Sequence, residues 1–204
     1  ECPPSLARAM EIDELGYPPD LWKKMADLGW FALALPEQFG GQGMPLTYLG
    51  IIIEEAGRSI APVPIHSTMT AALTIAEHGT EEQRHKLLPA VSRGDLILTW
   101  AMMEVDPRLV PQGIKTEAIE DGNDFVLNGS KMFVDNFGIA QQCLVVCRTS
   151  QPSSENEGLS LFLVDTDSSG ISYNVLTTMA KDRQCRVTFD NLRVPKANLL
   201  GDLN

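Results

Sequence analysis

The sequence predicts an α+β protein in which an N-terminal all-helical domain is followed by an antiparallel β-sheet or barrel domain. Two observations support this fold class. Residues 1–94 place apolar side chains at helical spacing between glycine stops, whereas residues 95–204 contain short β-branched and aromatic runs between turn clusters. The pattern changes at Gly94-Asp95. We therefore expect two domains, 1–94 and 95–204.

The helical half should hold amphipathic helices with recognisable ends. We expect them from Asp20 to Gly29, over residues 46–58, over residues 64–78, and from Thr80 to about Arg93. Asp20 is the expected N-cap of the first helix, and Gly29 its stop. Thr80 and Gln83 form a capping box, in which each side chain serves a backbone N–H group of the other.

The second half should form strands separated by turns. The runs that predict strands are LILTWAMM, IKTEAIED, DFVLNG, KMFVD, CLVVCRT, LSLFLVD, ISYNVLT and RQCRVTFD. Asn128-Gly129 lies between two apolar runs and predicts a two-residue hairpin turn. Cys143 and Cys147 would share one strand face, which indicates core packing.

Composition excludes several classes of function. The net charge of −11 is spread along the chain without a basic patch, so binding to nucleic acid or to a membrane surface is not expected. No run of about 18 apolar residues could span a membrane. His66, His78 and His85 lack zinc-ligand spacing, so no metal site is assigned. Four scattered cysteines favour a reducing intracellular compartment.

Two aromatic residues on successive strands leave two interpretations open. Trp100 lies in LTWAMME, and Phe133 lies in KMFVDN. Such a pair usually indicates core packing. The alternative is a platform on which a flat aromatic ligand stacks while backbone N–H groups hold its edge.

Longer motifs point to a known family. Residues 28–43, LGWFALALPEQFGGQG, resemble the signature of the acyl-CoA dehydrogenase family, and IEEAGRSIAP, HGTEEQRHKLLPAVSRGD, FVLNGSKMFVDN and VTFDNLRVPKANLLG follow in the family's order. The resemblance covers nearly the whole chain. It implies a helical domain, a middle β domain and a C-terminal helical bundle. The last would begin near Gly201, where this sequence ends, so we expect it to be absent here.

The resemblance also implies an activity. Family members hold FAD against the middle domain and oxidise an acyl-CoA thioester at Cα–Cβ, with hydride transfer to the flavin. The implied partners are an electron-transfer flavoprotein-type acceptor and further subunits of a homo- or hetero-oligomer. The implied location is the cytoplasm, or the mitochondrial matrix in a eukaryote. The usual catalytic base belongs to the C-terminal bundle, so no catalytic residue is assigned in this chain.

The residues that the resemblance aligns with the FAD contacts are Trp100, Met102, Met103, Leu109, Phe133 and Asp135. Phe133 can stack on a flavin. Met103 and Asp135 stand where the family has threonines, and Leu109 stands where it has a serine. Thioether, carboxylate and isobutyl groups cannot donate the hydrogen bonds that these hydroxyls supply. We therefore expect the chain alone to bind FAD weakly or not at all.

Three functions remain as alternatives. The chain could be part of an active acyl-CoA dehydrogenase. It could instead be a non-catalytic subunit of a heteromeric acyl-CoA dehydrogenase whose FAD contacts are degenerate. A third possibility is another reaction on the same fold, such as that of a flavin monooxygenase or an acyl-CoA oxidase.

Overall fold

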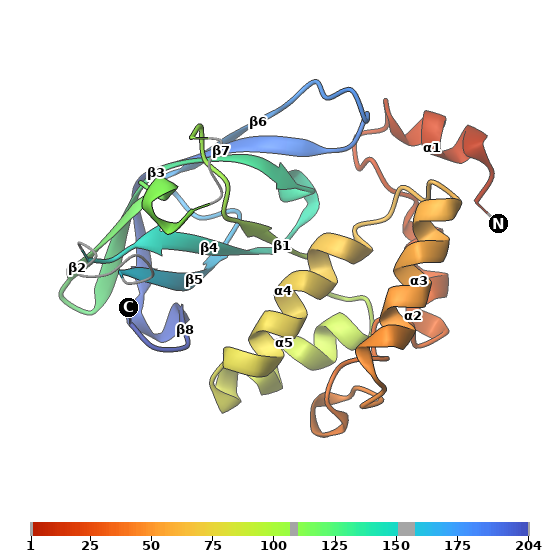
Figure 1. Ribbon diagram of the computed structural model, residues 1–204, viewed down its shortest axis with the longest axis horizontal. Coiled ribbons are helices and arrows are strands. Elements are labelled where there is room, and N and C mark those ends of the chain that lie inside the picture. The colour runs from red at the N-terminus through yellow and green to blue at the C-terminus, as the bar shows by residue number, and fades with distance from the viewer. Residues whose placement is uncertain (1, 107–109, 151–157, 204) are drawn as a thin grey trace. The chain divides into compact units, whose positions relative to one another are not determined.

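The computed structural model describes residues 2–106, 110–150 and 158–203. It divides into two compact units, which are described separately (Figure 1). One unit comprises the chain up to Leu98 together with Met179–Asp182, and the other comprises Thr99–Thr178 together with the chain from Arg183 onward. Helices fill the first unit and a mostly antiparallel sheet fills the second, which confirms the predicted fold class.

Four of the described helices of the first unit lie close to their expected positions, and another lies before the first expected one. The bounds are α1 Pro4–Met10, α2 Pro19–Asp27, α3 Leu46–Arg58, α4 Ile65–His78 and α5 Glu81–Ser92, with a 3-10 turn η1 at Glu37–Phe39. The capping box is confirmed: the Gln83 N–H donates to the Thr80 hydroxyl at 3.2 Å, and the Thr80 N–H donates to the Gln83 side chain at 2.9 Å.

The predicted N-cap at Asp20 is wrong. Helix α2 begins at Pro19, Pro18 occupies the N-cap position, and no side chain caps the first turn. Proline suits the first helical position because its φ is already helical and its missing N–H would have had no partner in the helix. Asp20 lies within the first turn, where its negative charge complements the helix dipole.

An aromatic cluster anchors the helical unit. The rings of Trp22 and Phe31 lie 4.0 Å apart between centroids, and the Trp22 Nε1–H donates to the Gly94 carbonyl at 2.9 Å. Helix α3, by contrast, buries only Leu49, while Tyr48 and Ile51 are 47% and 56% exposed. One apolar face of α3 is therefore open within the described unit. No helix among the described residues is long and apolar enough to cross a membrane.

The second unit is an open sheet. Its strands are β1 Leu98–Ala101, β2 Glu117–Asp121, β3 Asp124–Asp135, β4 Gln142–Arg148, β5 Leu159–Asp165, β6 Ile171–Val175, β7 Gln184–Pro195 and β8 Leu199–Leu200. They follow the order β6-β7-β3-β2-β4-β5-β8, and β1 pairs with β4. The path does not close into a barrel. Along it, only the contact between Glu117 and Arg148 is parallel.

The predicted hairpin at Asn128-Gly129 is wrong, because strand β3 runs straight through it. The β2–β3 turn instead lies at Gly122, whose φ is +63°. Gly129 is needed for close approach: a Cβ there would lie 2.5 Å from the Thr116 hydroxyl. Asn128 accepts a hydrogen bond from the backbone N–H of Asn191 at 2.8 Å, at a bulge in β7. Both residues therefore serve the sheet rather than a turn.

Candidate functional site

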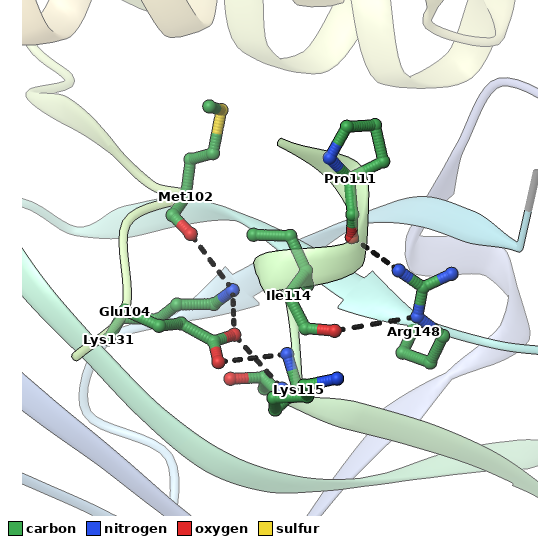
Figure 2. A network of polar contacts seen from close by, with 8 residues as sticks. Met102, Glu104, Pro111, Ile114, Lys115, Lys131 and Arg148 are labelled. Carbon is green, nitrogen blue, oxygen red and sulfur yellow. Dashed lines mark hydrogen bonds and ion pairs between the residues drawn. The ribbon is translucent and has the colours of Figure 1, made fainter. Parts of the chain in front are cut away.

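Three segments of the β unit meet just beyond the end of β1. They are residues 102–104, which follow β1, residues 114–116, which precede β2, and Lys131 in the middle of β3 (Figure 2). The first two segments are irregular, so no strand ladder fixes them. Side-chain hydrogen bonds hold them in place, together with single backbone bonds from the Met132 N–H to the Met103 carbonyl and from the Arg148 N–H to the Thr116 carbonyl.

A buried ion pair forms the centre of this meeting point. The Lys131 ammonium donates to Glu104 Oε1 at 2.8 Å and to the Met102 carbonyl at 3.2 Å. The same carboxylate accepts the backbone N–H groups of Lys115 and Thr116 at 2.8 and 2.9 Å. The Lys131 and Glu104 side chains are 0% and 8% exposed. The carboxylate therefore has three donors, which satisfies a charge that would be costly to bury alone.

These surroundings keep Glu104 ionised. Burial opposes its charge, but the Lys131 ammonium and the Thr116 backbone outweigh that cost, so the pKa of the Glu104 carboxyl lies below its usual value. Burial acts on the partner as well and lowers the pKa of Lys131, against the attraction of Glu104. Because three donors already hold its carboxylate as an ion, Glu104 is poorly suited to accept a substrate proton.

Arg148 secures the neighbouring loop. Its guanidinium, at the end of β4, donates to the Pro111 carbonyl and, at 3.4 Å, to the Ile114 carbonyl (Figure 2). These bonds hold η2, the 3-10 turn Pro111–Gly113, against the sheet.

A cavity of about 170 Å³ lies within this frame. Its lining is Met102, Met103, Glu104, Asp106, Val110, Pro111, Gly113, Ile114, Val146 and Leu159. Whole ligands usually occupy about 300–1,000 Å³, so this space suits one part of a ligand. A larger cavity of about 530 Å³ lies between α2 and α3 in the helical unit. Its charged lining residues are Lys24, Asp27 and Glu55, and both carboxylates are paired, with Lys23 and Arg58, so we do not place the chemistry there.

Phe133 is presented outward by a bulge in β3. The pairing with β7 shifts between Lys131 and Val134, and the extra residue puts Phe133 in the left-handed region at φ +56°. That conformation costs roughly 1–2 kcal/mol for a residue with a Cβ. The ring is 47% exposed. A strained, exposed aromatic residue is a feature expected of a binding site rather than of a core. Phe133 therefore fits the platform interpretation better than the packing one.

The other expected site residues lie around the same strand ends. Met102 and Met103 are half-buried in the cavity wall, and the Met103 carbonyl accepts the Met132 N–H at 2.8 Å, next to Phe133. The Thr99 hydroxyl donates to the Asp135 carbonyl at 2.5 Å, which joins β1 to the end of β3. Trp100 is half-buried in β1, next to Thr99 in the sequence.

The sixth expected residue, Leu109, lies outside the described residues. The remaining five gather where β1 and β3 end.

Sequence reasoning gave no role to Lys131, Glu104 or Arg148. One signal for Lys131 was available. The alternation of β3 turns Phe125 and Leu127 inward, and Lys131 falls in the same phase. A lysine at an inward position of a strand indicates a buried partner. Which carboxylate supplies that partner depends on the fold.

Comparison with known proteins gives two family matches. The model described as the N-terminal domain of acyl-CoA dehydrogenase matches residues 1–95, and the model for the middle domain matches residues 100–192. Among curated proteins, acyl-CoA dehydrogenase FadE26 of Mycobacterium tuberculosis is 34% identical over 179 residues, which are 86% of this chain and 45% of the relative. The chain spans about half the length of the curated relatives it matches.

Solved structures agree with these matches. The ChsE4-ChsE5 complex from Mycobacterium tuberculosis aligns with a TM-score of 0.86 at 31% identity, covering 100% of this chain and 53% of the other. An acyl-CoA dehydrogenase complexed with FAD from Bacillus anthracis aligns with a TM-score of 0.82 at 27% identity, covering 98% and 35%.

Proposed function

Because the chain belongs to the acyl-CoA dehydrogenase family, we propose that it takes part in the α,β-oxidation of an acyl-CoA thioester with FAD. The observation that supports this most is Phe133, an exposed aromatic residue in a strained backbone conformation beside the Met102–Met103 segment. A planar ring system is the kind of ligand that such a residue recognises.

The residues present fit the ring of FAD and lack part of its polar recognition. Phe133 can stack on the ring, and the ends of β1 and β3 offer backbone groups to its edge. Bound FAD would supply the acceptor for a hydride. Met103 and Asp135 cannot donate hydrogen bonds in place of the threonines that the family resemblance expects. We therefore propose that FAD binds this chain through stacking and backbone contacts, with an affinity weaker than micromolar.

Substrate chemistry sets a further requirement. The α proton of the thioester must pass to a base, and Glu104 is held as an ion by three donors. We assign the base to no residue of this chain. We propose that the electrons leave through an electron-transfer flavoprotein-type acceptor. We also propose that the chain works in an oligomer, because α3 exposes the apolar residues Leu46, Tyr48 and Ile51.

A second function is favoured by Met103 and Asp135. A chain without side-chain donors at these positions could serve as the non-catalytic subunit of a heteromeric acyl-CoA dehydrogenase. One solved relative is itself a complex of two differently named chains, ChsE4 and ChsE5. In this case FAD would bind only when a partner chain completes the site.

Titration of FAD into the purified chain, followed by flavin fluorescence, tests the first proposal. We expect Phe133→Ala to weaken binding roughly 3–10-fold, since an aromatic stack contributes about 0.5–1.5 kcal/mol. Tyr173→Ala is the matched control, because Tyr173 is 45% exposed on β6 of the same sheet. Equal losses in the two variants would contradict the platform.

The complementary change restores the missing donors. Met103→Thr combined with Asp135→Thr should tighten FAD binding about thirtyfold, since each of the two recovered hydrogen bonds contributes about 1 kcal/mol. No binding by either form of the isolated chain, with binding after a partner chain is added, would favour the second function.

A further inference from the structure

We propose that Lys131 and Glu104 are positioning residues of the flavin site, which fix the end of β1 and the bulge of β3 relative to each other. This inference rests on the proposed function, because it assigns the pair a task toward the cofactor. Neither residue is proposed to touch the ligand. Their effect would pass through the backbone of residues 102–103 and through Phe133.

The first argument is energetic. Moving a carboxylate and an ammonium from water into a protein interior costs several kcal/mol for each ion, and apolar residues of similar volume usually stabilise a fold equally well. Lys131 is nevertheless 0% exposed and Glu104 only 8% exposed. A pair with so little net benefit for stability is better explained by the geometry that it enforces.

The second argument concerns what the pair holds. Residues 102–104 follow β1 without any strand pairing, and the same is true of residues 114–116 before β2. Lys131 grips the first segment at the Met102 carbonyl, and Glu104 grips the second at the N–H groups of Lys115 and Thr116. Both segments contribute to the wall of the 170 Å³ cavity. The Met132 N–H also donates to the Met103 carbonyl and the Arg148 N–H to the Thr116 carbonyl, so the ion pair adds side-chain links to backbone bonds that already tie both segments to the sheet.

The third argument concerns the bulge. Lys131 is the last β3 residue in regular register with β7, opposite Val187, and pairing resumes only at Val134 opposite Cys185. Because the ammonium anchors Lys131 inward, the extra residue must be absorbed at positions 132 and 133. This is where Phe133 adopts its left-handed conformation and where the Met132 N–H donates to the Met103 carbonyl. The ion pair therefore sets where the bulge falls.

The test uses the full chain and three variants. Lys131→Met removes one charge and leaves Glu104 unpaired, so it also risks misfolding. Lys131→Met combined with Glu104→Gln removes both charges at nearly constant volume and should fold. Lys196→Met is the matched control, because Lys196 pairs with Glu120 on the exposed side of the same sheet.

Two measurements are made on each variant. Hydrogen exchange of the amides of Lys115, Thr116 and Met132 measures how firmly residues 102–104 and 114–116 are held to β3. FAD titration, read as affinity and as the visible absorption band of bound flavin, reports the site. In the double variant we expect exchange of these amides at least tenfold faster, FAD affinity at least tenfold weaker and a shifted flavin band. The control should stay within twofold of the unmodified chain in both.

The outcomes separate the possibilities. Faster exchange with unchanged FAD affinity and an unchanged band would overturn the positioning role and leave a purely structural pair. Unchanged exchange would show that the ion pair does not hold these segments, and the inference would be wrong. If the unmodified chain and its Met103→Thr, Asp135→Thr form bind no FAD, the proposed function fails for this chain and the cofactor part of the inference fails with it. The exchange measurement then still decides whether the pair holds the segments.

Discussion

The same pair of residue types occurs in two regions of the β unit with opposite surroundings. Inside the sheet, Lys131 meets Glu104 with both side chains buried. At its rim, Lys196 meets Glu120 with side chains 43% and 56% exposed. The rim also holds Arg193, which pairs with Asp121 and Asp124 in the open.

The difference shows that burial, rather than charge, determines how much stability is lost when one partner of an ion pair is removed. Water screens the rim pairs and hydrates each partner when the two separate. The net contribution of these pairs to stability is therefore small. The interior pair has no such replacement, because removal of one partner leaves an uncompensated ion. The interior also contains a close backbone approach, at which Gly129 lies too near Thr116 to carry a Cβ.

The largest expected effect comes from breaking one pair in each region. Lys131→Met should lower the free energy of unfolding by about 3–5 kcal/mol, because Glu104 would remain buried as an unpaired ion. Lys196→Met should lower it by about 0–1 kcal/mol. Urea denaturation of both variants measures the two values. Equal losses would show that the interior pair is hydrated in solution.

Replacement of a glycine by alanine should likewise destabilise the fold more in the interior than at the rim. Gly129→Ala places a methyl group 2.5 Å from the Thr116 hydroxyl and 2.6 Å from its backbone, so it should destabilise the fold by about 1–3 kcal/mol. Gly122→Ala, in the β2–β3 turn, meets open space and pays only for its φ of +63°, about 1 kcal/mol. Thermal unfolding followed by circular dichroism should rank them in this order.

The pH dependence of stability should also show that the buried Glu104 carboxylate is ionised in the folded chain. Since the pKa of Glu104 is lower in the folded chain than in the unfolded one, its contribution is complete above the unfolded value of about 4.5 and is lost as the pH falls below that value. Glu104→Gln should therefore flatten the decline of stability with acidification in this range. Urea midpoints measured at several pH values give the slope. An unchanged slope would mean that the carboxylate is not held as the structure indicates.

The smallest expected effect leaves stability untouched and concerns thiol reactivity. Cys143, Cys147 and Cys185 are buried and free in the β unit, whereas Cys2 is partly exposed. Burial raises the pKa of Cys147 to about 12, so almost no thiolate is present at neutral pH. A thiol reagent should therefore label Cys2 rapidly and the other three only after denaturation. Rapid labelling of more than one thiol would indicate that the sheet interior opens.

Many local features follow from the sequence alone. Residues 46–58 form a helix with the expected ends, and the Thr80–Gln83 capping box is present as predicted. Strand β5 coincides with its apolar run at Leu159–Asp165. These features depend on residues within about one turn or one strand of each other, so sequence periodicity and capping chemistry are sufficient to specify them.

The family resemblance also proposed site residues, and their role in binding stays a prediction. It placed five described residues, among them Phe133 and Met103, where β1 and β3 end. It could not show that Phe133 is lifted out of the sheet by a bulge. It also gave no role to Lys131, although this residue lies within the motif FVLNGSKMFVDN, and none to Arg148, which lies outside the quoted motifs.

Pairings between distant segments, by contrast, were decided only by the tertiary structure. Asn128-Gly129 satisfies the local rule for a hairpin, yet the strand continues because Thr116, just before β2, and Asn191, in β7, approach it from elsewhere in the sheet. Lys131 shows its inward phase in the sequence, but its partner Glu104 lies 27 residues away. Local preferences amount to about 1 kcal/mol or less, whereas the burial of an ion or the overlap of two backbones costs more. Contacts made across the sheet therefore prevail wherever the two conflict.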